Sequence, residues 1–108
     1  MVKSQAELDR TFGALADPSR RSMLDALAAG PRTISELAEP LPMSLVAASK
    51  HVTVLERAGL LSRARAGRAQ VCTLVAHPLA DATGWLETYR SFWTTRLDSL
   101  ERYLTEDG

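Results

Sequence analysis

The sequence contains few of the residues that build catalytic or metal centres. One cysteine and two histidines in 108 residues provide neither a disulfide framework nor the converging thiolate and imidazole donors that zinc needs. There is also no glycine-rich phosphate loop and no pairing of a nucleophile with a base. We therefore expect a protein that is not an enzyme and has no cofactor or metal ion. The low cysteine content suits a reducing, cytoplasmic compartment.

Long apolar runs are absent as well. No stretch is long enough to cross a bilayer, and residues 1–16 have a mixed polar and apolar pattern instead of that of a secretory signal. We expect no membrane partner. The length of 108 residues predicts a single domain over residues 1–108.

The formal net charge is zero, which by itself argues against a nucleic-acid partner. The charges are, however, unevenly distributed along the chain. Residues 44–70 contain five basic side chains against one acid, a net charge of +4, whereas residues 79–108 contain three against six, a net charge of −3. A basic segment of this kind is expected where one surface faces phosphate groups.

The basic segment begins with a pattern typical of a helix from Ser44 to Gly59. Ser44 is a good N-cap residue, and Gly59 can end the helix in the left-handed conformation. The face predicted to pack consists of Ala47, Ala48, Val52, Val54, Leu55 and Ala58. The other face combines hydroxyl groups, cations and two apolar side chains: Ser44, Leu45, Val46, Ser49, Lys50, Thr53 and Arg57. Such a helix fits the major groove of DNA, although an ordinary amphipathic helix also has two faces.

Two helices are predicted at the start of the chain. Ser4 and Glu7 form a capping box for a helix over residues 4–16. Asp17 as N-cap and Pro18 at the first helical position begin a second helix, which closes at Gly30 and directs inward Met23, Leu24 and Leu27.

Arg20 and Arg21 lie in the first turn of that second helix, where cations oppose the helix dipole. They therefore need a partner, either a carboxylate such as Asp17 or a DNA phosphate.

A short third helix follows over residues 33–38. Thr33 or Ser35 caps it, and Ile34 can first form a brief extended pairing. Pro40 cannot continue this helix. A short helix, a tight turn and a second capped helix make a helix-turn-helix over residues 33–59, in which residues 44–59 form the recognition helix.

Alternation with period two on both sides of Gly67 predicts a β-hairpin over residues 60–75, with Gly67 supplying the positive φ of its turn. Arg63, Arg65 and Arg68 cluster toward the tip with no acid among them. Charges on an edge strand often only prevent aggregation. Here the three arginines come directly after a candidate recognition helix, and this position favours a wing that binds phosphates or the minor groove.

The last predicted element is one continuous helix over residues 78–104. Its apolar positions 79, 82, 86, 89, 93, 97, 100 and 104 step by three and four. At ~1.5 Å per residue it extends ~39 Å, longer than so small a domain can cover. Its aromatic side chains therefore indicate a partner surface, most simply that of a second copy. Packing within the monomer, or a pocket for a small apolar ligand, are the alternatives.

Four segments form a joint pattern: FGALADPSRR at residues 12–21, ISELA at 34–38, AASKHVTVLERAGLL at 47–61 and the hairpin turn at 67–68. This pattern resembles the ArsR/SmtB family of bacterial winged helix-turn-helix repressors, over about residues 8–104. The resemblance implies a mainly α fold with a small β-hairpin and five or so helices. It also implies a homodimer that binds an inverted-repeat operator and dimerises through its terminal helices, residues 1–16 and 78–104. The expected interface residues are Leu8, Phe12, Trp85, Tyr89, Phe92, Trp93, Leu97 and Leu100.

The metal ligands of the metal-sensing members are missing from this chain. Those members place Cys-x-Cys before the recognition helix, where this chain has Ala-Glu-Pro at residues 38–40, or histidines on the last helix, where this chain has none. Cys72, His51 and His77 fall on three different elements. The resemblance therefore implies the non-metal-binding branch, whose members are often self-regulating repressors. His51 is interpreted as a structural histidine and Cys72 as a core residue.

We therefore expect a sequence-specific transcriptional repressor that acts on double-stranded DNA as a homodimer without a metal effector. Base contacts are expected from Ser44, Leu45, Val46, Ser49 and Lys50, and phosphate contacts from Thr53, Arg57, Arg63, Arg65 and Arg68. A winged helix that binds another protein through Leu45 and Val46 is the alternative from a different class. Release of the DNA by a small apolar ligand also stays open.

Overall fold

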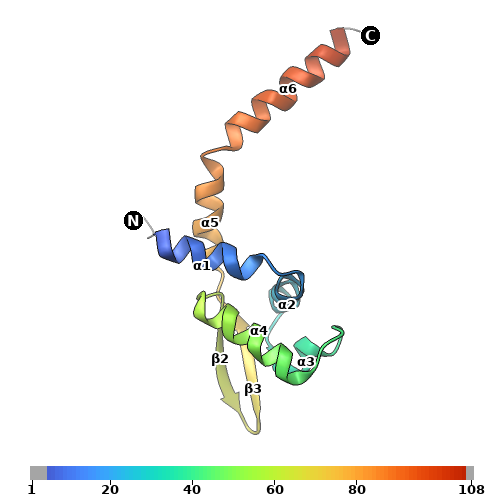
Figure 1. The fold of residues 1–108 in the computed structure, drawn as a ribbon. Helices are drawn as coiled ribbons and strands as arrows, with labels where there is room; N and C mark the ends of the chain where they lie inside the picture. The colour runs from blue at the N-terminus through green and yellow to red at the C-terminus, as the bar shows by residue number, and fades with distance from the viewer. Residues whose placement is uncertain (1–4, 107–108) are drawn as a thin grey trace.

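The computed structural model describes residues 5–106, which form six helices and a small three-stranded sheet (Figure 1). In chain order the elements are α1 (Gln5–Leu15), α2 (Pro18–Ala28), β1 (Arg32–Thr33), α3 (Ile34–Ala38), α4 (Leu45–Arg57), β2 (Leu61–Ala66), β3 (Ala69–Leu74), α5 (His77–Glu87) and α6 (Arg90–Glu106). The helix-turn-helix of α3 and α4 and the β2–β3 hairpin lie next to each other, as the sequence predicted. The hairpin is the wing.

The predicted helix starts are confirmed at three positions. The Asp17 carboxylate accepts hydrogen bonds from the backbone N–H groups of Ser19 (2.7 Å) and Arg20 (3.3 Å) at the start of α2. Partial burial raises the pKa of Asp17, but these two hydrogen bonds and the nearby charges outweigh it and hold the pKa below its ordinary value. Thr33 forms a full capping box for α3, and Ser44 caps α4. The capping box predicted at Ser4 lies outside the described residues.

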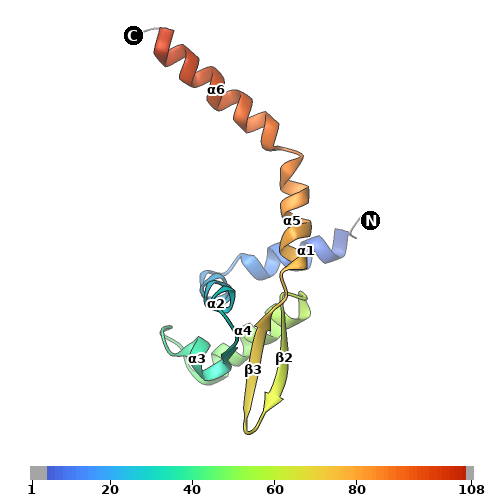
Figure 2. The ribbon, with the colours of Figure 1, turned by 180° about the vertical axis from the view of Figure 1, so that it is seen from behind.

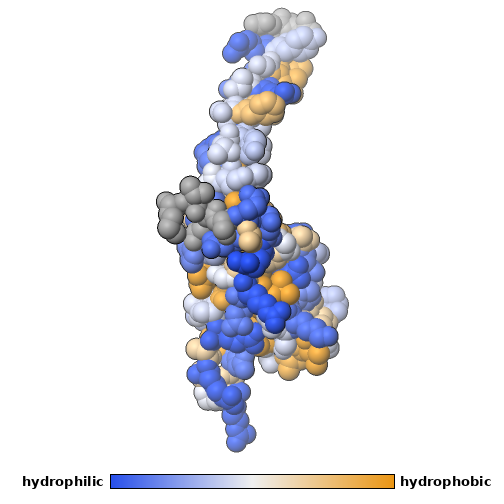
Figure 3. All heavy atoms as spheres, turned by 60° about the vertical axis from the view of Figure 1, so that its left-hand side comes forward, coloured by the Kyte–Doolittle hydropathy of each residue, from blue (hydrophilic) through white to orange (hydrophobic). Residues whose placement is uncertain are grey.

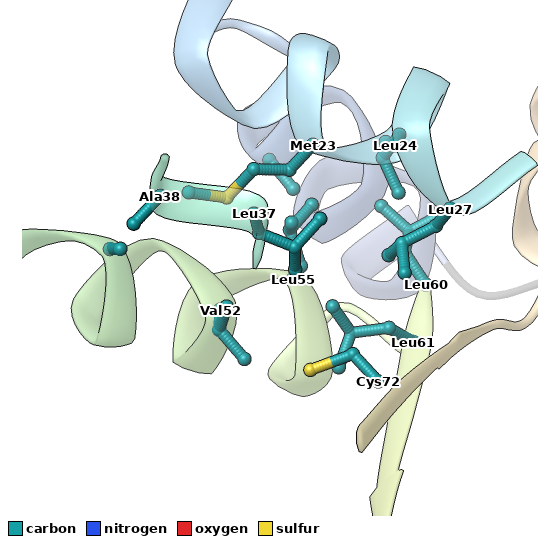
Figure 4. Packing of buried hydrophobic residues seen from close by; sticks show 12 residues of the cluster. Met23, Leu24, Leu27, Leu37, Ala38, Val52, Leu55, Leu60, Leu61 and Cys72 are labelled. Carbon is teal, nitrogen blue, oxygen red and sulfur yellow. The ribbon is translucent and has the colours of Figure 1, made fainter. Parts of the chain in front are cut away.

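One stripe of α4 lies at the centre of the core. Ala48, Val52 and Leu55 have no exposed surface, and side chains from α2, α3 and the sheet surround them (Figure 4). The predicted inward residues of α2 are buried too. Val54 was wrongly predicted to pack: it is 39% exposed, because at 3.6 residues per turn it lies to one side of the stripe.

The sheet has the strand order β1-β3-β2, and both pairings are antiparallel. The hairpin runs in register from Leu61 opposite Leu74 to Ala66 opposite Ala69. Gly67 has φ of +64° in the turn, as predicted. The brief extended pairing expected at Ile34 instead involves Arg32 and Thr33, which pair with β3 and make a third strand. Ile34 is already helical because its neighbour Thr33 is the N-cap of α3.

The prediction of one continuous C-terminal helix is wrong. The helix stops after Glu87 and restarts at Arg90. At the break the Thr88 hydroxyl donates to the carbonyl of Trp85 (2.7 Å), and the backbone N–H of Tyr89 donates to Leu86, three residues back (3.0 Å). A threonine side chain that competes for backbone carbonyls, together with a tightened last turn, ends α5. The apolar spacing continues across the break, which is why periodicity alone missed it.

The second half of the broken helix stands away from the body, as both ribbon views show (Figure 2). The radius of gyration is 18.4 Å and the longest dimension is 64 Å. A compact chain of this length would have a radius of gyration of about 13 Å. Every α6 side chain that the structure describes is exposed. This arm, α6, therefore gains little burial from its own chain.

None of the described helices combines the length and the apolar content that crossing a bilayer requires.

The central position of α4 can be tested with one pair of substitutions. Leu55→Ala should lower the free energy of unfolding by about 2–5 kcal/mol, because it leaves a cavity in a fully packed site. Leu45→Ala, the same change in the exposed first turn of the same helix, should alter it by less than about 0.5 kcal/mol. Urea unfolding at one fixed protein concentration measures both. Similar losses for the two variants would contradict the assignment of faces.

Candidate nucleic-acid interface

The first turns of α4 present an uncovered face. Ser44 accepts a hydrogen bond from the backbone N–H of Ala47 (3.1 Å), which fixes the start of the helix. Leu45 and Val46 follow and are 54% and 67% exposed. Ser49 is half-buried and Lys50 is exposed on the next turn. The five side chains that were predicted to contact bases therefore all lie on the first two turns of α4 or at its N-cap. Val46 and Lys50 lie opposite the buried stripe, whereas Leu45 lies on the side of the stripe and is exposed because it belongs to the first turn.

The wing projects below α4 as a hydrophilic tip (Figure 3). Arg65 and Arg68 are exposed on it. Among residues 5–106, neither of these arginines, nor Lys50, has a carboxylate within ion-pair distance. Their charges are thus uncompensated, which is the state in which cations bind phosphate groups most readily.

Arg63 differs from the other two wing arginines. Its guanidinium lies 3.0 Å from the Glu56 carboxylate and donates to the Thr53 hydroxyl (3.1 Å) and to the Gln70 side-chain carbonyl (3.0 Å). Arg63 and Thr53, both predicted to contact phosphate, therefore contact each other. The alternation of side chains along β2 could have predicted that Arg63 turns toward the core, because Arg63 lies on the same strand face as the buried Leu61.

Arg57 lies at the far end of α4, away from the other predicted DNA-binding residues. It lines a cavity of about 230 Å³ together with residues of α1 and of the start of α5. Thirteen residues of helix separate the two ends of α4, a distance of about 20 Å. The structure therefore does not bring Arg57 into the cluster at the first turns of α4 and the wing.

The arginines at the start of α2 have a role that the sequence did not reveal. Arg20 donates to the carbonyls of Ala14 (2.8 Å) and Gly13 (3.1 Å), and Arg21 donates to that of Leu15 (2.6 Å). These carbonyls lie at the C-terminal end of α1, where cations are favourable. The predicted Asp17 carboxylate is a weaker partner of Arg20, at 3.9 Å.

His51 and Cys72 are structural, as predicted. Nη1 of Arg20 forms a hydrogen bond with Nδ1 of His51 (3.2 Å), and this bond joins α2 to α4. Cys72 has no exposed surface, and burial raises the pKa of its thiol. In the part of the chain that the structure describes, no group of three or more histidine, cysteine or acidic side chains could hold a metal ion.

A second uncovered surface lies on α1, α5 and α6. Trp85 packs edge-on against Phe12 (5.6 Å between ring centroids) and also contacts Tyr89. These rings continue into a stripe of large apolar side chains, each more than half exposed: Phe92, Trp93, Leu97, Leu100, Tyr103 and Leu104. Packing within the monomer, one of the sequence-based alternatives, therefore does not account for them.

Comparisons with known proteins agree with this geometry. A family model described as a helix-turn-helix domain matches residues 15–63. The chain is 37% identical over 100 residues to the HTH-type transcriptional regulator Rv2034 of Mycobacterium tuberculosis, covering 93% of this chain and 91% of that protein. It is 32% identical over 79 residues to the transcriptional repressor SdpR of Bacillus subtilis, covering 73% of this chain and 88% of SdpR.

A solved structure extends the agreement to the fold. The ArsR family transcriptional regulator RHA00566 matches with a TM-score of 0.79 and 36% sequence identity, and the match covers 87% of this chain and 97% of that one. The protein is a transcriptional regulator and not an enzyme, as the sequence predicted. By its sequence and its winged helix-turn-helix fold, the chain belongs to the ArsR family.

Proposed function

We propose that the protein is a homodimeric repressor that binds an inverted-repeat operator with α4 in the major groove and the wing on the flanking backbone. One observation supports this most directly. The helix α4, with its exposed first turns, and the wing, which carries the uncompensated Arg65 and Arg68, lie next to each other at the end of the molecule away from α6 (Figure 1). A winged helix-turn-helix binds DNA with these two elements.

The base contacts in this proposal come from the first two turns of α4. Leu45 and Val46 are apolar and exposed, which suits contact with a thymine methyl group. Ser49 and Lys50 provide donors for base edges. Lys50 is the only cation on this part of α4, so most of the electrostatic attraction comes from Arg65 and Arg68 on the wing.

The dimer is proposed to form through α1, α5 and α6. The exposed apolar stripe of α6 has no partner within residues 5–106, and a large apolar surface of this kind marks an interface. Two copies related by a two-fold axis would present two α4 helices to successive major grooves, about 34 Å apart. The same symmetry would make the operator an inverted repeat.

No metal effector is part of the proposal. The described residues contain no suitable cluster of metal ligands. The repressor part of the proposal is supported by the relative SdpR, a transcriptional repressor whose match covers 73% of this chain. As a bacterial DNA-binding regulator, the protein would act in the cytoplasm, where the chromosome lies.

Arg68→Ala should weaken binding to all DNA sequences, because the wing would lose one phosphate contact. The dependence of log K on log salt concentration should fall by about one unit. Fluorescence anisotropy at several salt concentrations measures the slope with a genomic fragment selected by the wild-type protein. Arg90→Ala, which removes an arginine from the arm, is the matched control. An unchanged slope for Arg68→Ala would remove this residue from the interface.

Ser49→Ala and Lys50→Ala should each cost about 1–3 kcal/mol of operator binding and relax the preference at one position in each half-site. Binding selection from a random DNA library, followed by sequencing, reports the preference. Equal losses on operator and random DNA would contradict base contacts. If the wild-type protein shows no salt-sensitive DNA binding, a protein-binding role for Leu45 and Val46 is favoured instead.

Leu97→Glu should shift the protein from dimer to monomer, because it places a charge in the apolar stripe of α6. Thr95→Glu puts the same charge about 200° around the helix, on the opposite face, and should leave the dimer intact. Sedimentation velocity of both variants at micromolar concentration separates the two states. A dimer that persists with Leu97→Glu would place the interface elsewhere.

A further inference from the structure

The guanidinium of Arg63 joins the wing to the recognition helix. On the wing side, its Nη1 donates to the side-chain carbonyl of Gln70 (3.0 Å). On the α4 side, its Nη2 lies 3.0 Å from the carboxylate of Glu56 and donates to the hydroxyl of Thr53 (3.1 Å). One side chain of β2 thus contacts β3 and two adjacent turns of α4.

A second hydrogen bond extends from Thr53 to the turn of α4 that is proposed to face DNA. The hydroxyl of Thr53, which accepts from Arg63, donates in turn to the backbone carbonyl of Ser49 (3.0 Å). Ser49 and its neighbour Lys50 are the donors that we assign to base edges. A chain of hydrogen bonds therefore connects the wing with the part of α4 that is proposed to contact bases.

Arg63 is poorly placed to bind a phosphate itself. Glu56 compensates its charge, and three of its donor hydrogens are directed to Gln70, Thr53 and Glu56. Its Nε is buried and has no hydrogen-bond partner within residues 5–106, so solvent and DNA do not reach it. Arg65, two residues further along the same strand face, is exposed and has none of these contacts.

Arg63 also lies at the boundary between the buried and the exposed part of β2. Its cross-strand neighbour is Cys72, which is fully buried, and Leu61 two residues earlier is buried as well. Beyond Arg63 every residue of β2 is exposed. Its side chain is thus at the last position of β2 that is partly buried, and the projecting tip begins after it.

We propose that Arg63 is a positioning residue, which fixes the angle between the wing and α4 so that both reach one DNA duplex together. The proposal rests on the DNA-binding function above. It assigns Glu56, the one acid between residues 44 and 70, to holding Arg63 in place. The phosphate contacts of the wing are then made by Arg65 and Arg68.

The DNA test compares Arg63→Ala, Arg63→Lys and Glu56→Gln with Arg65→Ala as the matched control. Arg63→Ala should weaken operator binding about tenfold and leave the salt slope and binding to random DNA unchanged. Arg63→Lys should not restore affinity, because an ammonium group cannot form the same fork of donors. Arg65→Ala should lower the salt slope by about one unit.

Glu56→Gln separates positioning from phosphate binding. Removing an acid near DNA ordinarily strengthens binding to every sequence, whereas loss of positioning weakens operator binding. If Arg63→Ala lowers the salt slope like Arg65→Ala, and Glu56→Gln strengthens binding, Arg63 is a phosphate contact and the proposal is wrong. A normal thermal unfolding curve for Glu56→Gln confirms that this variant is folded.

A measurement without DNA tests the junction independently of the proposed function. In ¹⁵N-correlated NMR spectra of the free protein, Arg63→Ala should shift the amide signals of Ser49 and Thr53, and Arg65→Ala should not. Unshifted α4 signals with Arg63→Ala overturn the proposal, whatever the DNA results. If the wild-type protein binds no DNA, the proposed function fails, and these spectra alone decide whether Arg63 holds α4 and the wing together.

Discussion

Burial of one stripe of α4 is the constraint on which the rest of the structure depends. Ala48, Val52 and Leu55 have no exposed surface, and α2, α3 and the sheet all pack around them. Because a helix is rigid, fixing this stripe also fixes the opposite face. Val46 and Lys50 stay in solvent for that reason. The exposed face of α4 is therefore a consequence of the core, and it is the face that a DNA-binding regulator needs.

The polar contacts around this core connect helices end to end. Arg20 and Arg21 lie in the first turn of α2 and donate to backbone carbonyls at the end of α1, so the same two side chains connect the end of one helix to the start of the next. His51 ties the same arginine to α4. On the opposite side of α4, Arg63 connects it to the wing. The helix α4 is thus held by hydrogen bonds on two sides as well as by its buried stripe.

The arm has the opposite character. Its apolar side chains remain exposed, and just before it Trp85 contacts both Phe12 of the body and Tyr89. A helix of seventeen residues with no packing partner has little stability of its own in water. Burial against a second copy would supply what the monomer lacks, which links the stability of α6 to dimer formation.

The sequence by itself determined the local features: the caps at Asp17, Thr33 and Ser44, the tight turn at Gly67 and the buried stripe of α4. Capping, turn conformation and periodicity depend on neighbouring residues, so they can be predicted from spacing alone. Only the tertiary structure decided which arginines are paired, because the partners of Arg20 and Arg63 lie on other elements. The break at Thr88 is local, but the apolar spacing did not predict it, because the hydroxyl competes for the Trp85 carbonyl without changing the apolar period.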